Sequence, residues 1–353
     1  MKILIYANYL AVYEGNFISS LKVLENKFRE KQIQVIWCFP IEAERLDWVQ
    51  NMKKTRKIYF LESDIYKGKK SLKKMVEKEK IDIIYAHFIN LKEKIMFMII
   101  QHKYKIKCFT HEHNHIKKNK CLKKKIKMFI ERKFIHIGCS KDVEQDMLAY
   151  GIKKENVTYV ENAIQFERLE KWEKLKNSYY NIPENAIKIL MFGGGYYRKG
   201  VDIAIGAINK LNSQKKLNIY LLIVCSGGQD EIKSTIYREY GKIEWIRVIK
   251  AREDVATYYK FADIFISPSR EEGFCYSLIE AAYCGCKVIG SRIPAQRDLK
   301  IPDIEWFESE NIEELCKKII FSINKERDNR IPQIVKENYN IDTWANDIMN
   351  ILI

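Results

Sequence analysis

The segment REEGFCYSLIEAAYCGCKVIGS, residues 270–291, brings acidic side chains, a glycine and an aromatic residue together between an apolar run and a helical pattern. Glu272 and Glu280 stand on either side of the expected helix start, and a Gly-Phe pair follows the first of them. A loop between a strand and a helix is where a ligand-binding site is expected, because ligands of open parallel sheets bind beyond the carboxyl ends of the strands. The alternative is structural: Ser277 and Glu280 have the spacing of a capping box at the start of a helix.

A second candidate is MFGGGYYRKGVDIAIGAINKL, residues 191–211, in which three glycines follow an apolar run and precede a helical pattern. Glycines let the backbone approach an anion, and the start of a helix offers unpaired N–H groups. With Arg198 and Lys199 beside it, the segment favours phosphate binding. It matches neither the dinucleotide motif nor a P-loop, because Arg198 replaces the last glycine and no G-K-[ST] follows. A turn with solvated basic side chains is the alternative.

Histidines alternate in FTHEHNH, residues 109–115. On an extended segment His111, His113 and His115 would share one face, as metal ligands do. The sequence offers no fourth ligand at a suitable spacing, so we expect no metal, and a solvated loop is one alternative. His87, in YAHF, is expected to be structural.

The elements that hold these segments are short apolar strands separated by stretches of helix length. Continuous apolar strands indicate parallel sheets covered on both faces, and two series of them indicate two doubly wound α/β domains. We expect the first domain at 1–165, the second at 180–335 and a linker at 166–186. The expected strands are 2–7, 33–39, 81–88, 106–111, 134–140, 156–162, 187–195, 219–227, 243–249, 263–269 and 286–291.

The composition is that of a chain of two ordinary domains, with 353 residues of which 47% are hydrophobic. Its longest apolar runs are far shorter than the roughly 20 residues of a membrane-spanning helix. Nine cysteines without any C-x-x-C spacing indicate neither a disulfide framework nor a zinc ribbon, so a cytoplasmic location fits best.

Positive charge is concentrated in the first half of the chain. Residues 1–165 hold 34 Lys and Arg against 19 Asp and Glu, whereas residues 166–353 hold 28 against 27. Such a difference is expected when one half faces phosphates, nucleic acid or an anionic membrane. Compositional drift is the alternative.

The most basic segment is KKNKCLKKKIKMFIERK, residues 117–133, whose nine Lys and Arg face a single acid, Glu131. Apolar residues are interleaved, which is typical of a helix on a membrane surface. A solvated helix is the alternative. Nucleic acid is disfavoured because Phe129 is the only aromatic residue available for stacking. We expect anionic lipid to be contacted by Lys123, Lys124, Lys125 and Lys127.

In order and spacing, these segments resemble the retaining GT-B glycosyltransferases of family four. SPSREEGFCYSLIEAAYCGCKVIGS and GGGYYRKGVDIAIGAINKL are similar to the donor-binding half of that family, whose pattern runs S-x-x-E-G-F-G and then E-A-x-A-x-G. GCSKDVEQDMLAYGIKKENVTYVENAI and YYKFADIFISPS fall in the order that the family has. The resemblance implies two Rossmann-like domains that face each other across a cleft, which holds the active site.

The activity implied by the resemblance is a retaining, metal-independent transfer of a hexosyl or N-acetylhexosaminyl group. The donor would be a nucleotide sugar, most simply a UDP-sugar, bound as a substrate without any cofactor. The acceptor would be a glycan or a lipid-linked glycan of a bacterial surface polysaccharide, such as a capsule or an exopolysaccharide. The sequence does not indicate an oligomeric state.

Matching positions imply a role for each site residue. Lys199 would hold the diphosphate with help from Arg198, Glu280 would accept hydrogen bonds from the ribose, and Glu272 would face the transferred sugar. His111, or else His113, would contact donor or acceptor. Cys275 replaces a glycine of the family, so its side chain would protrude towards the sugar unless it is a small buried side chain. The expected backbone contacts to the donor are Gly15, Gly194, Gly273, Phe274 and Cys275.

The end of the chain fits the same resemblance. Trp344, Ile348 and Ile351 follow a possible cap at Asp342 and fall on one helical face. In the family this last helix returns to the first domain, so we expect residues 340–353 there. Two rival functions remain open: a catalytically silent subunit that recognises glycans, and a sugar-nucleotide epimerase of similar fold, which the E-G-F motif disfavours.

Overall fold

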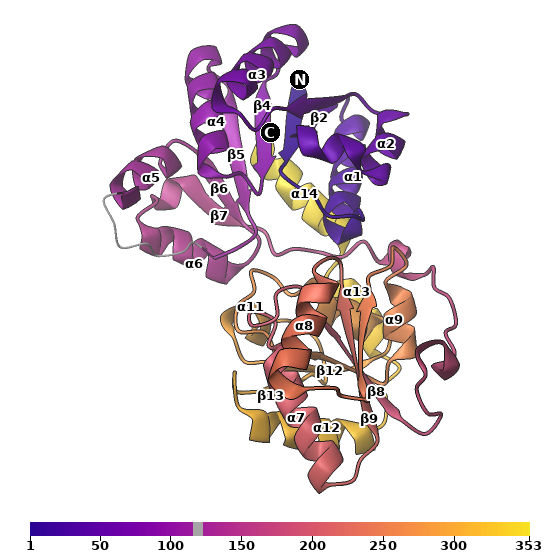
Figure 1. Cartoon of the computed structure of the whole chain (residues 1–353). Helices are drawn as coiled ribbons and strands as arrows, with labels where there is room; N and C mark the ends of the chain where they lie inside the picture. Colours follow the sequence, from indigo (N-terminus) through magenta and orange to yellow (C-terminus); the bar gives the residue numbers. More distant parts are fainter. Residues whose placement is uncertain (116–122) are drawn as a thin grey trace. The chain divides into compact units, whose positions relative to one another are not determined.

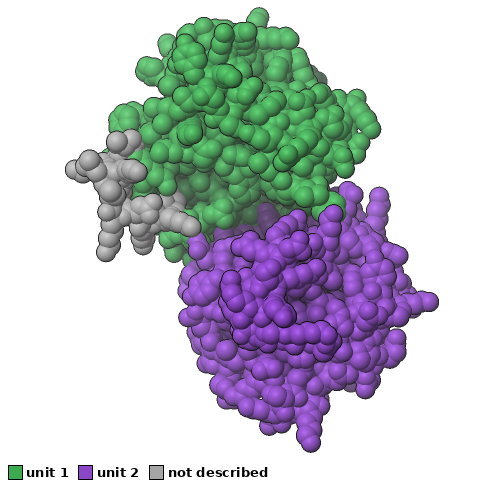
Figure 2. Space-filling model, viewed as in Figure 1, with its two compact units in different colours: residues 1–163, 341–353 green, residues 164–340 purple. Residues whose placement is uncertain are grey.

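The computed structural model describes residues 1–115 and 123–353, which form two compact units (Figures 1 and 2). Unit 1 comprises residues 1–163 and 341–353, and unit 2 comprises residues 164–340. The chain therefore leaves unit 1 after Ala163 and returns to it at Ile341. The sequence pattern alone places the corresponding boundaries at 165, 180, 335 and 340.

Unit 1 is built on a parallel sheet whose described strands have the order β3-β2-β1-β4-β5-β6-β7. The central strands are apolar along their whole length because helices cover both faces of the sheet. The strands are β1 (Lys2–Ala7), β2 (Gln34–Pro40), β3 (Ile58–Leu61), β4 (Ile83–His87), β5 (Lys107–Glu112), β6 (Ile135–Gly138) and β7 (Val157–Tyr159).

The helices of unit 1 divide between the two faces. One core holds side chains of α1, α2 and α14, and the other holds side chains of α3, α4 and α5. The described helices are α1 (Gly15–Glu30), α2 (Asp47–Lys53), α3 (Ile65–Glu79), α4 (Leu91–Tyr104), α5 (Lys123–Glu131), α6 (Lys141–Tyr150) and α14 (Ile341–Leu352), with 3-10 turns η1 (Ile41–Arg45) and η2 (Lys154–Asn156).

The last helix, α14, packs against α1, as Figure 1 shows for the yellow helix beside the indigo one. Trp344 and Ile348 are buried in this contact, and Ile351 is partly buried. Asp342 does not cap the helix, since it lies in the first turn and pairs with Lys27 at 2.9 Å.

Unit 2 repeats the design with the strand order β10-β9-β8-β11-β12-β13. Side chains of α7, α8 and α12 fill the core on one face. The strands are β8 (Ile187–Phe192), β9 (Ile219–Cys225), β10 (Ile246–Lys250), β11 (Ile264–Ser267), β12 (Lys287–Ser291) and β13 (Glu305–Phe307). The helices are α7 (Val201–Gln214), α8 (Gln229–Tyr240), α9 (Ala256–Phe261), α10 (Tyr276–Tyr283), α11 (Pro294–Arg297), α12 (Ile312–Asn324) and α13 (Ile331–Asn338), with turns η3 (Phe166–Leu169) and η4 (Asn177–Tyr180).

Residues 166–186 are not a free linker, which corrects the interpretation from sequence. Phe166 is buried and its ring lies 4.4 Å from that of Tyr283. The Glu173 N–H donates to Thr257 Oγ1 at 2.9 Å, and the Glu173 carboxylate pairs with Arg252 at 2.6 Å. The charged composition reads as a linker, but the segment belongs to unit 2, and both apolar and charged side chains of it contact the rest of that unit.

None of the helices in residues 1–115 and 123–353 combines the length and the apolar character that crossing a membrane requires.

Candidate functional site

The loops that follow β8 and β11 lie side by side, because these two strands are neighbours in the sheet of unit 2. Strands β8, β9 and β10 follow one another towards one edge of the sheet, and β11, β12 and β13 follow one another towards the other edge. The strand order therefore reverses between the two loops. Open α/β sheets bind ligands at such a reversal. The Arg270 N–H joins the loops by donating to the Arg198 carbonyl oxygen at 2.9 Å.

Gly200, the residue before α7, allows the two loops to approach each other. A Cβ atom at this position would lie 2.0 Å from the carbonyl oxygen of Pro268, which is far inside van der Waals contact. Its backbone also has a φ of 66°, which residues with a side chain rarely adopt. The close contact of the two loops therefore depends on a glycine here.

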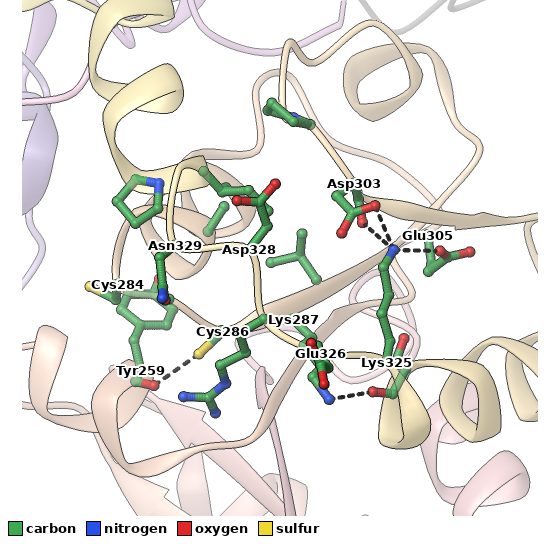
Figure 3. Close-up of a pocket in the computed structure, with 18 of the residues that line it drawn as sticks. Tyr259, Cys284, Cys286, Lys287, Asp303, Glu305, Lys325, Glu326, Asp328 and Asn329 are labelled. Carbon is green, nitrogen blue, oxygen red and sulfur yellow. Dashed lines mark hydrogen bonds and ion pairs between the residues drawn. The ribbon is translucent and has the colours of Figure 1, made fainter.

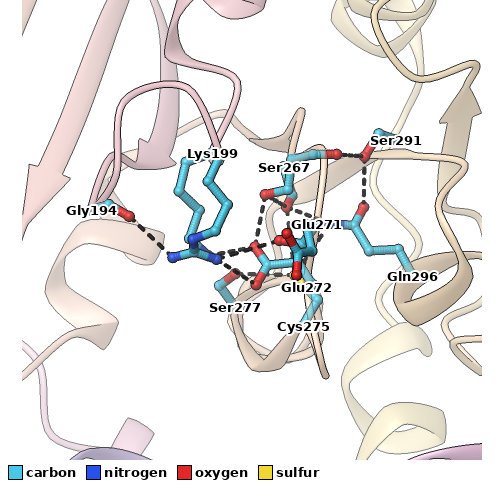
Figure 4. A network of polar contacts seen from close by, with 11 residues as sticks. Gly194, Lys199, Ser267, Glu271, Glu272, Cys275, Ser277, Ser291 and Gln296 are labelled. Carbon is cyan, nitrogen blue, oxygen red and sulfur yellow. Dashed lines mark hydrogen bonds and ion pairs between the residues drawn. The ribbon is translucent and has the colours of Figure 1, made fainter. Parts of the chain in front are cut away.

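Glu272 is the centre of the contacts between these loops (Figure 4). Its Oε1 lies 2.5 Å from Lys199 Nζ and accepts a hydrogen bond from Ser269 Oγ at 2.7 Å. Its Oε2 lies 3.3 Å from Arg198 Nη1. Two cations face one carboxylate that is only 8% exposed, so the group carries a surplus positive charge at the start of α7. An anion is the ligand that this surplus favours.

A buried polar network fixes the loop behind Glu272. Ser291 Oγ donates to the Ser269 carbonyl oxygen at 2.6 Å, and Gln296 Nε2 donates to Ser267 Oγ at 2.8 Å. Gln296 is fully buried. Figure 4 shows Ser267, Ser291 and Gln296 gathered on one side of Glu272. The network holds the carboxylate in place before any ligand binds.

Cys275 belongs to this network. Its side chain is 2% exposed, and its Sγ lies 3.5 Å from Ser267 Oγ and 3.4 Å from Ser277 Oγ. Burial, and after it the charge of Glu272, raise the pKa of the Cys275 thiol, so it stays protonated at neutral pH. The cysteine is therefore a small buried side chain that reduces the space beside Glu272.

Glu280 is held by two partners that sequence reasoning missed. Its Oε1 forms an ion pair with Arg168, and its Oε2 accepts a hydrogen bond from the Tyr259 hydroxyl at 3.0 Å. The capping box with Ser277 is not formed, because α10 begins at Tyr276 without any side-chain cap. Arg168 gave no signal, since it lies in the segment that reads as a linker.

The remaining donor-side predictions lie around the same loops. The Gly194 carbonyl oxygen accepts from Arg198 Nη2 at 3.2 Å, and a Cβ on Gly194 would meet no atom within 4 Å. Gly273 and Phe274 are buried, and the Phe274 ring packs edge-on to that of Tyr276 at 5.1 Å. Within the described part of the chain, the open space at Gly194 leaves room for a ligand beside Arg198.

In unit 1 the strand order reverses between β1 and β4. Gly15 begins α1 after β1, with a φ of 59°. His111, in β5, is 1% exposed, and its Nδ1 lies 2.5 Å from the Tyr85 hydroxyl. Its strand partner is His87 of β4, not His115, which pairs with Asp146 at 2.5 Å. Of the three alternating histidines, His111 and His113 therefore lie together with His87 of the neighbouring strand, whereas His115 lies apart from them.

The basic segment is described only in part. Residues 117–122 and the side chains of Lys123, Lys124 and Lys125 lie outside the described residues. Lys127 Nζ lies 5.8 Å from the centre of the Tyr150 ring, and Phe129 is 58% exposed. A groove of about 690 Å³ runs beside Phe129, and its basic lining consists of His102, Lys103, Lys105, Lys107 and Lys133.

A further pocket, of about 280 Å³, lies at the opposite edge of the unit 2 sheet, where β12 and β13 begin (Figure 3). Lys325 pairs there with Asp303 and Glu305, at 2.6 and 3.2 Å. Lys287 Nζ donates to the carbonyl oxygen of Ser322 at 2.7 Å. Because these charges satisfy each other, the pocket is a weaker candidate than the loops around Glu272.

Parts of the sequence are similar to known proteins. A phosphatidylinositol N-acetylglucosaminyltransferase component of Homo sapiens is 26% identical over 170 residues, which cover 46% of this chain and 34% of the human protein. An N,N'-diacetylbacillosaminyl-diphospho-undecaprenol alpha-1,3-N-acetylgalactosaminyltransferase of Campylobacter jejuni is 28% identical over 149 residues, covering 42% and 38%. The chain thus matches little more than a third of the length of either relative.

The crystal structure of Anabaena HepE in complex with UDP-glucose superposes with a TM-score of 0.79 at 16% identity, covering 100% of this chain and 99% of that one. Residues 173–341 match the family described as Glycosyl transferases group 1. The chain therefore has the GT-B fold, and residues 173–341 of its second unit are similar to the glycosyl transferases group 1 family.

Proposed function

We propose that the protein is a retaining glycosyltransferase that moves a hexosyl or N-acetylhexosaminyl group from a nucleotide diphosphate, most simply UDP. The observation that carries the proposal is the contact of Lys199 and Arg198 with Glu272 at the reversal of strand order. The family of unit 2 and the UDP-glucose complex of a protein with the same fold support it.

The charges of the site suit a diphosphate leaving group. Negative charge builds up on the diphosphate as the bond to the sugar breaks, and fixed cations and N–H groups stabilise it most when they need not move. Lys199, Arg198 and the start of α7 supply such groups. When the bound diphosphate pairs with Lys199 and Arg198, the Glu272 carboxylate no longer has to pair with them. It is then free to accept hydrogen bonds from hydroxyl groups of the transferred sugar.

Glu280 suits the ribose of the nucleotide. A carboxylate has about four lone-pair sites, of which Arg168 and Tyr259 use two. The others are available to a diol. Cys275 narrows the space next to Glu272 and is the residue through which we expect this chain to choose among donor sugars.

For the acceptor we propose a lipid-linked glycan of a bacterial surface polysaccharide, met at the cytoplasmic face of a membrane. The names of the relatives from Homo sapiens and Campylobacter jejuni contain phosphatidylinositol and diphospho-undecaprenol, which are both lipids. In unit 1 the exposed Phe129 and the basic groove beside it have the mixed apolar and cationic character that anionic lipid surfaces attract.

The test is release of UDP or GDP from a panel of nucleotide sugars, with and without a bacterial lipid extract as acceptor. Lys199→Ala and Glu280→Gln should each lower turnover by about 100- to 1,000-fold, or about 3–4 kcal/mol, while the protein stays folded. Lys210→Ala is the matched control, because Lys210 lies on α7 but pairs with Glu313 away from the loops. Proton NMR of the product decides whether the anomeric configuration is retained.

Wild-type turnover in both variants would contradict the site. Absence of nucleotide release with every donor would favour a silent glycan-recognition protein. Isomerisation of a nucleotide sugar without any acceptor would favour an epimerase.

A further inference from the structure

Three histidines of unit 1 form a cluster at the carboxyl ends of β4 and β5. His87 Nδ1 lies 3.1 Å from His113 Nε2, and the rings of His111 and His113 stack with their centres 4.4 Å apart. One ring nitrogen of each residue lies within 4.8 Å of a ring nitrogen of the other two. The register of the sheet makes this cluster, since His87 of β4 stands opposite His111 of β5.

Among residues 1–115 and 123–353, two nitrogens of this cluster are buried without a hydrogen-bond partner: Nε2 of His87 and Nε2 of His111. The two side chains are 0% and 1% exposed. A buried polar atom left unpaired costs stability, so natural proteins rarely keep one without a use. Burial also lowers the pKa of both imidazoles, which keeps them neutral at physiological pH. Neutral imidazole is the form that binds a metal ion.

The surroundings are those of a metal site. The Tyr85 hydroxyl lies 2.5 Å from His111 Nδ1 and so fixes that ring from its far side, as partners of ligating histidines do. The rings of Phe17 and Phe88 pack on His113 with centres 5.2 and 4.4 Å away and supply an apolar wall. Phe88 has a φ of 55°, a backbone strain of the kind that gathers at functional sites.

A second cluster nearby does not compete for the ion but supplies charge. Lys94 Nζ lies 2.9 Å from Glu112 and 2.7 Å from Glu131, so it already occupies the place of a cation between those carboxylates. His136 belongs to the same cluster, with its Nδ1 3.5 Å from Glu112 Oε1. Glu112 stands between His111 and His113 in the chain, and its negative charge favours a cation bound by three neutral imidazoles.

We propose that His87, His111 and His113 bind one divalent transition-metal ion of the class that prefers imidazole nitrogen, such as Zn²⁺ or Co²⁺. Three histidines leave a fourth position open for water or another small ligand. The site lies wholly in unit 1 and shares no residue with the loops around Lys199 and Arg198, so it goes beyond the proposed function and does not depend on it.

The test is titration of the metal-free full-length protein with Co²⁺, followed by visible absorption and by calorimetry, with displacement by Zn²⁺. We expect one equivalent to bind and the thermal midpoint to rise. His113→Ala, at the least buried of the three positions, should weaken binding by at least about 10-fold. Tyr85→Phe should weaken it less. His115→Ala is the matched control, because that histidine of the same stretch pairs with Asp146.

The proposal fails if the protein binds no stoichiometric Co²⁺, or if His115→Ala weakens binding as much as His113→Ala does, which would indicate adventitious surface binding. A folded His87→Ala variant, checked by circular dichroism, that still binds one equivalent with unchanged affinity would also overturn it.

Discussion

Glu280 shows how one residue serves stability and ligand binding together. Glu280 is 6% exposed, and its carboxylate is compensated by Arg168, which comes from a segment more than 100 residues earlier in the chain. Removal of one partner from a buried ion pair leaves an uncompensated charge in a medium that solvates it poorly. The pair therefore ties residues 166–186 to the candidate donor site.

Arg168→Met should lower the free energy of unfolding of unit 2 by about 3–5 kcal/mol, since the methionine fills the space but leaves Glu280 charged and buried. Urea denaturation measures this loss. The double variant Arg168→Met with Glu280→Gln should recover most of the stability, because no buried charge remains. Equal stability of Arg168→Met and wild type would show that the pair contributes nothing.

At the residue scale, sequence reasoning chose two loops that the structure brings together, but it did not find the partners of their side chains. Lys199 and Glu272 follow two strands, and the strand ends of a parallel sheet meet at one edge, so their proximity could be expected. Tyr259 and Gln296 could not be found in this way. They reach the site from α9 and α11 through packing, which leaves no local pattern in the sequence.

At the element scale, the expected strands all appear, with bounds that differ by a few residues. Two strands were missed, β3 (Ile58–Leu61) and β13 (Glu305–Phe307). Both strands are short, and each lies at an edge of its sheet, where one side of the strand has no neighbouring strand and polar residues are tolerated. β3 is apolar, with the sequence IYFL, but at four residues it is too short to stand out as a strand, and β13 has only three residues, one of them Glu305.

The junction of β8 and α7 gives a prediction at this scale. Gly200→Ala should cost about 2 kcal/mol or more and should abolish turnover, because the new Cβ and the positive φ together force the loop away from Pro268. Chemical denaturation and nucleotide release measure the two effects. Gly227→Ala is the control, since a Cβ there meets no atom within 4 Å. Unchanged turnover in Gly200→Ala would contradict the importance of the loop contact.

Helix α5 gives a second prediction. Changing Lys123, Lys124, Lys125 and Lys127 to Glu should abolish sedimentation with anionic liposomes at low salt, because each lysine near such a surface contributes about 1 kcal/mol. Binding of UDP-sugar should not change.

The control for this experiment is an equal change of charge elsewhere in unit 1, on the exposed lysines of α3: Lys67, Lys69, Lys70 and Lys73. If both quadruple variants lose liposome binding alike, net charge rather than α5 directs docking. If neither loses it, the membrane proposal is wrong.

At the scale of the whole molecule, the two units differ in their titratable groups. All six histidines of the chain lie between residues 87 and 136, and hence in unit 1, while unit 2 has none. Burial, and then the neighbouring His113, lower the pKa of His87 well below its usual value of about 6.5, and the same causes act on His111. Burial lowers the pKa of His113 to about 4.

These shifts predict that acid unfolds unit 1 before unit 2. Below pH 6.5 the unfolded chain binds protons at these three histidines, whereas the folded unit does not, so the free energy of unfolding falls as the pH drops towards 4. Each histidine contributes at most about 1.4 kcal/mol per pH unit in this window. Glu112 adds to the loss below its unfolded pKa of about 4.3, because burial, which raises its folded pKa, is outweighed by Lys94 and His136 together, which lower it.

Hydrogen exchange read peptide by peptide separates the two units, in the presence of EDTA so that no metal ion occupies the histidines. Between pH 7 and pH 5 we expect opening of β4 and β5 to become progressively easier, while β8 and β11 keep their protection. His113→Asn should reduce the slope for unit 1, since one group that protonates only on unfolding is gone. Equal loss of protection in both units, or a slope unaffected by His113→Asn, would show that the buried histidines do not govern acid stability.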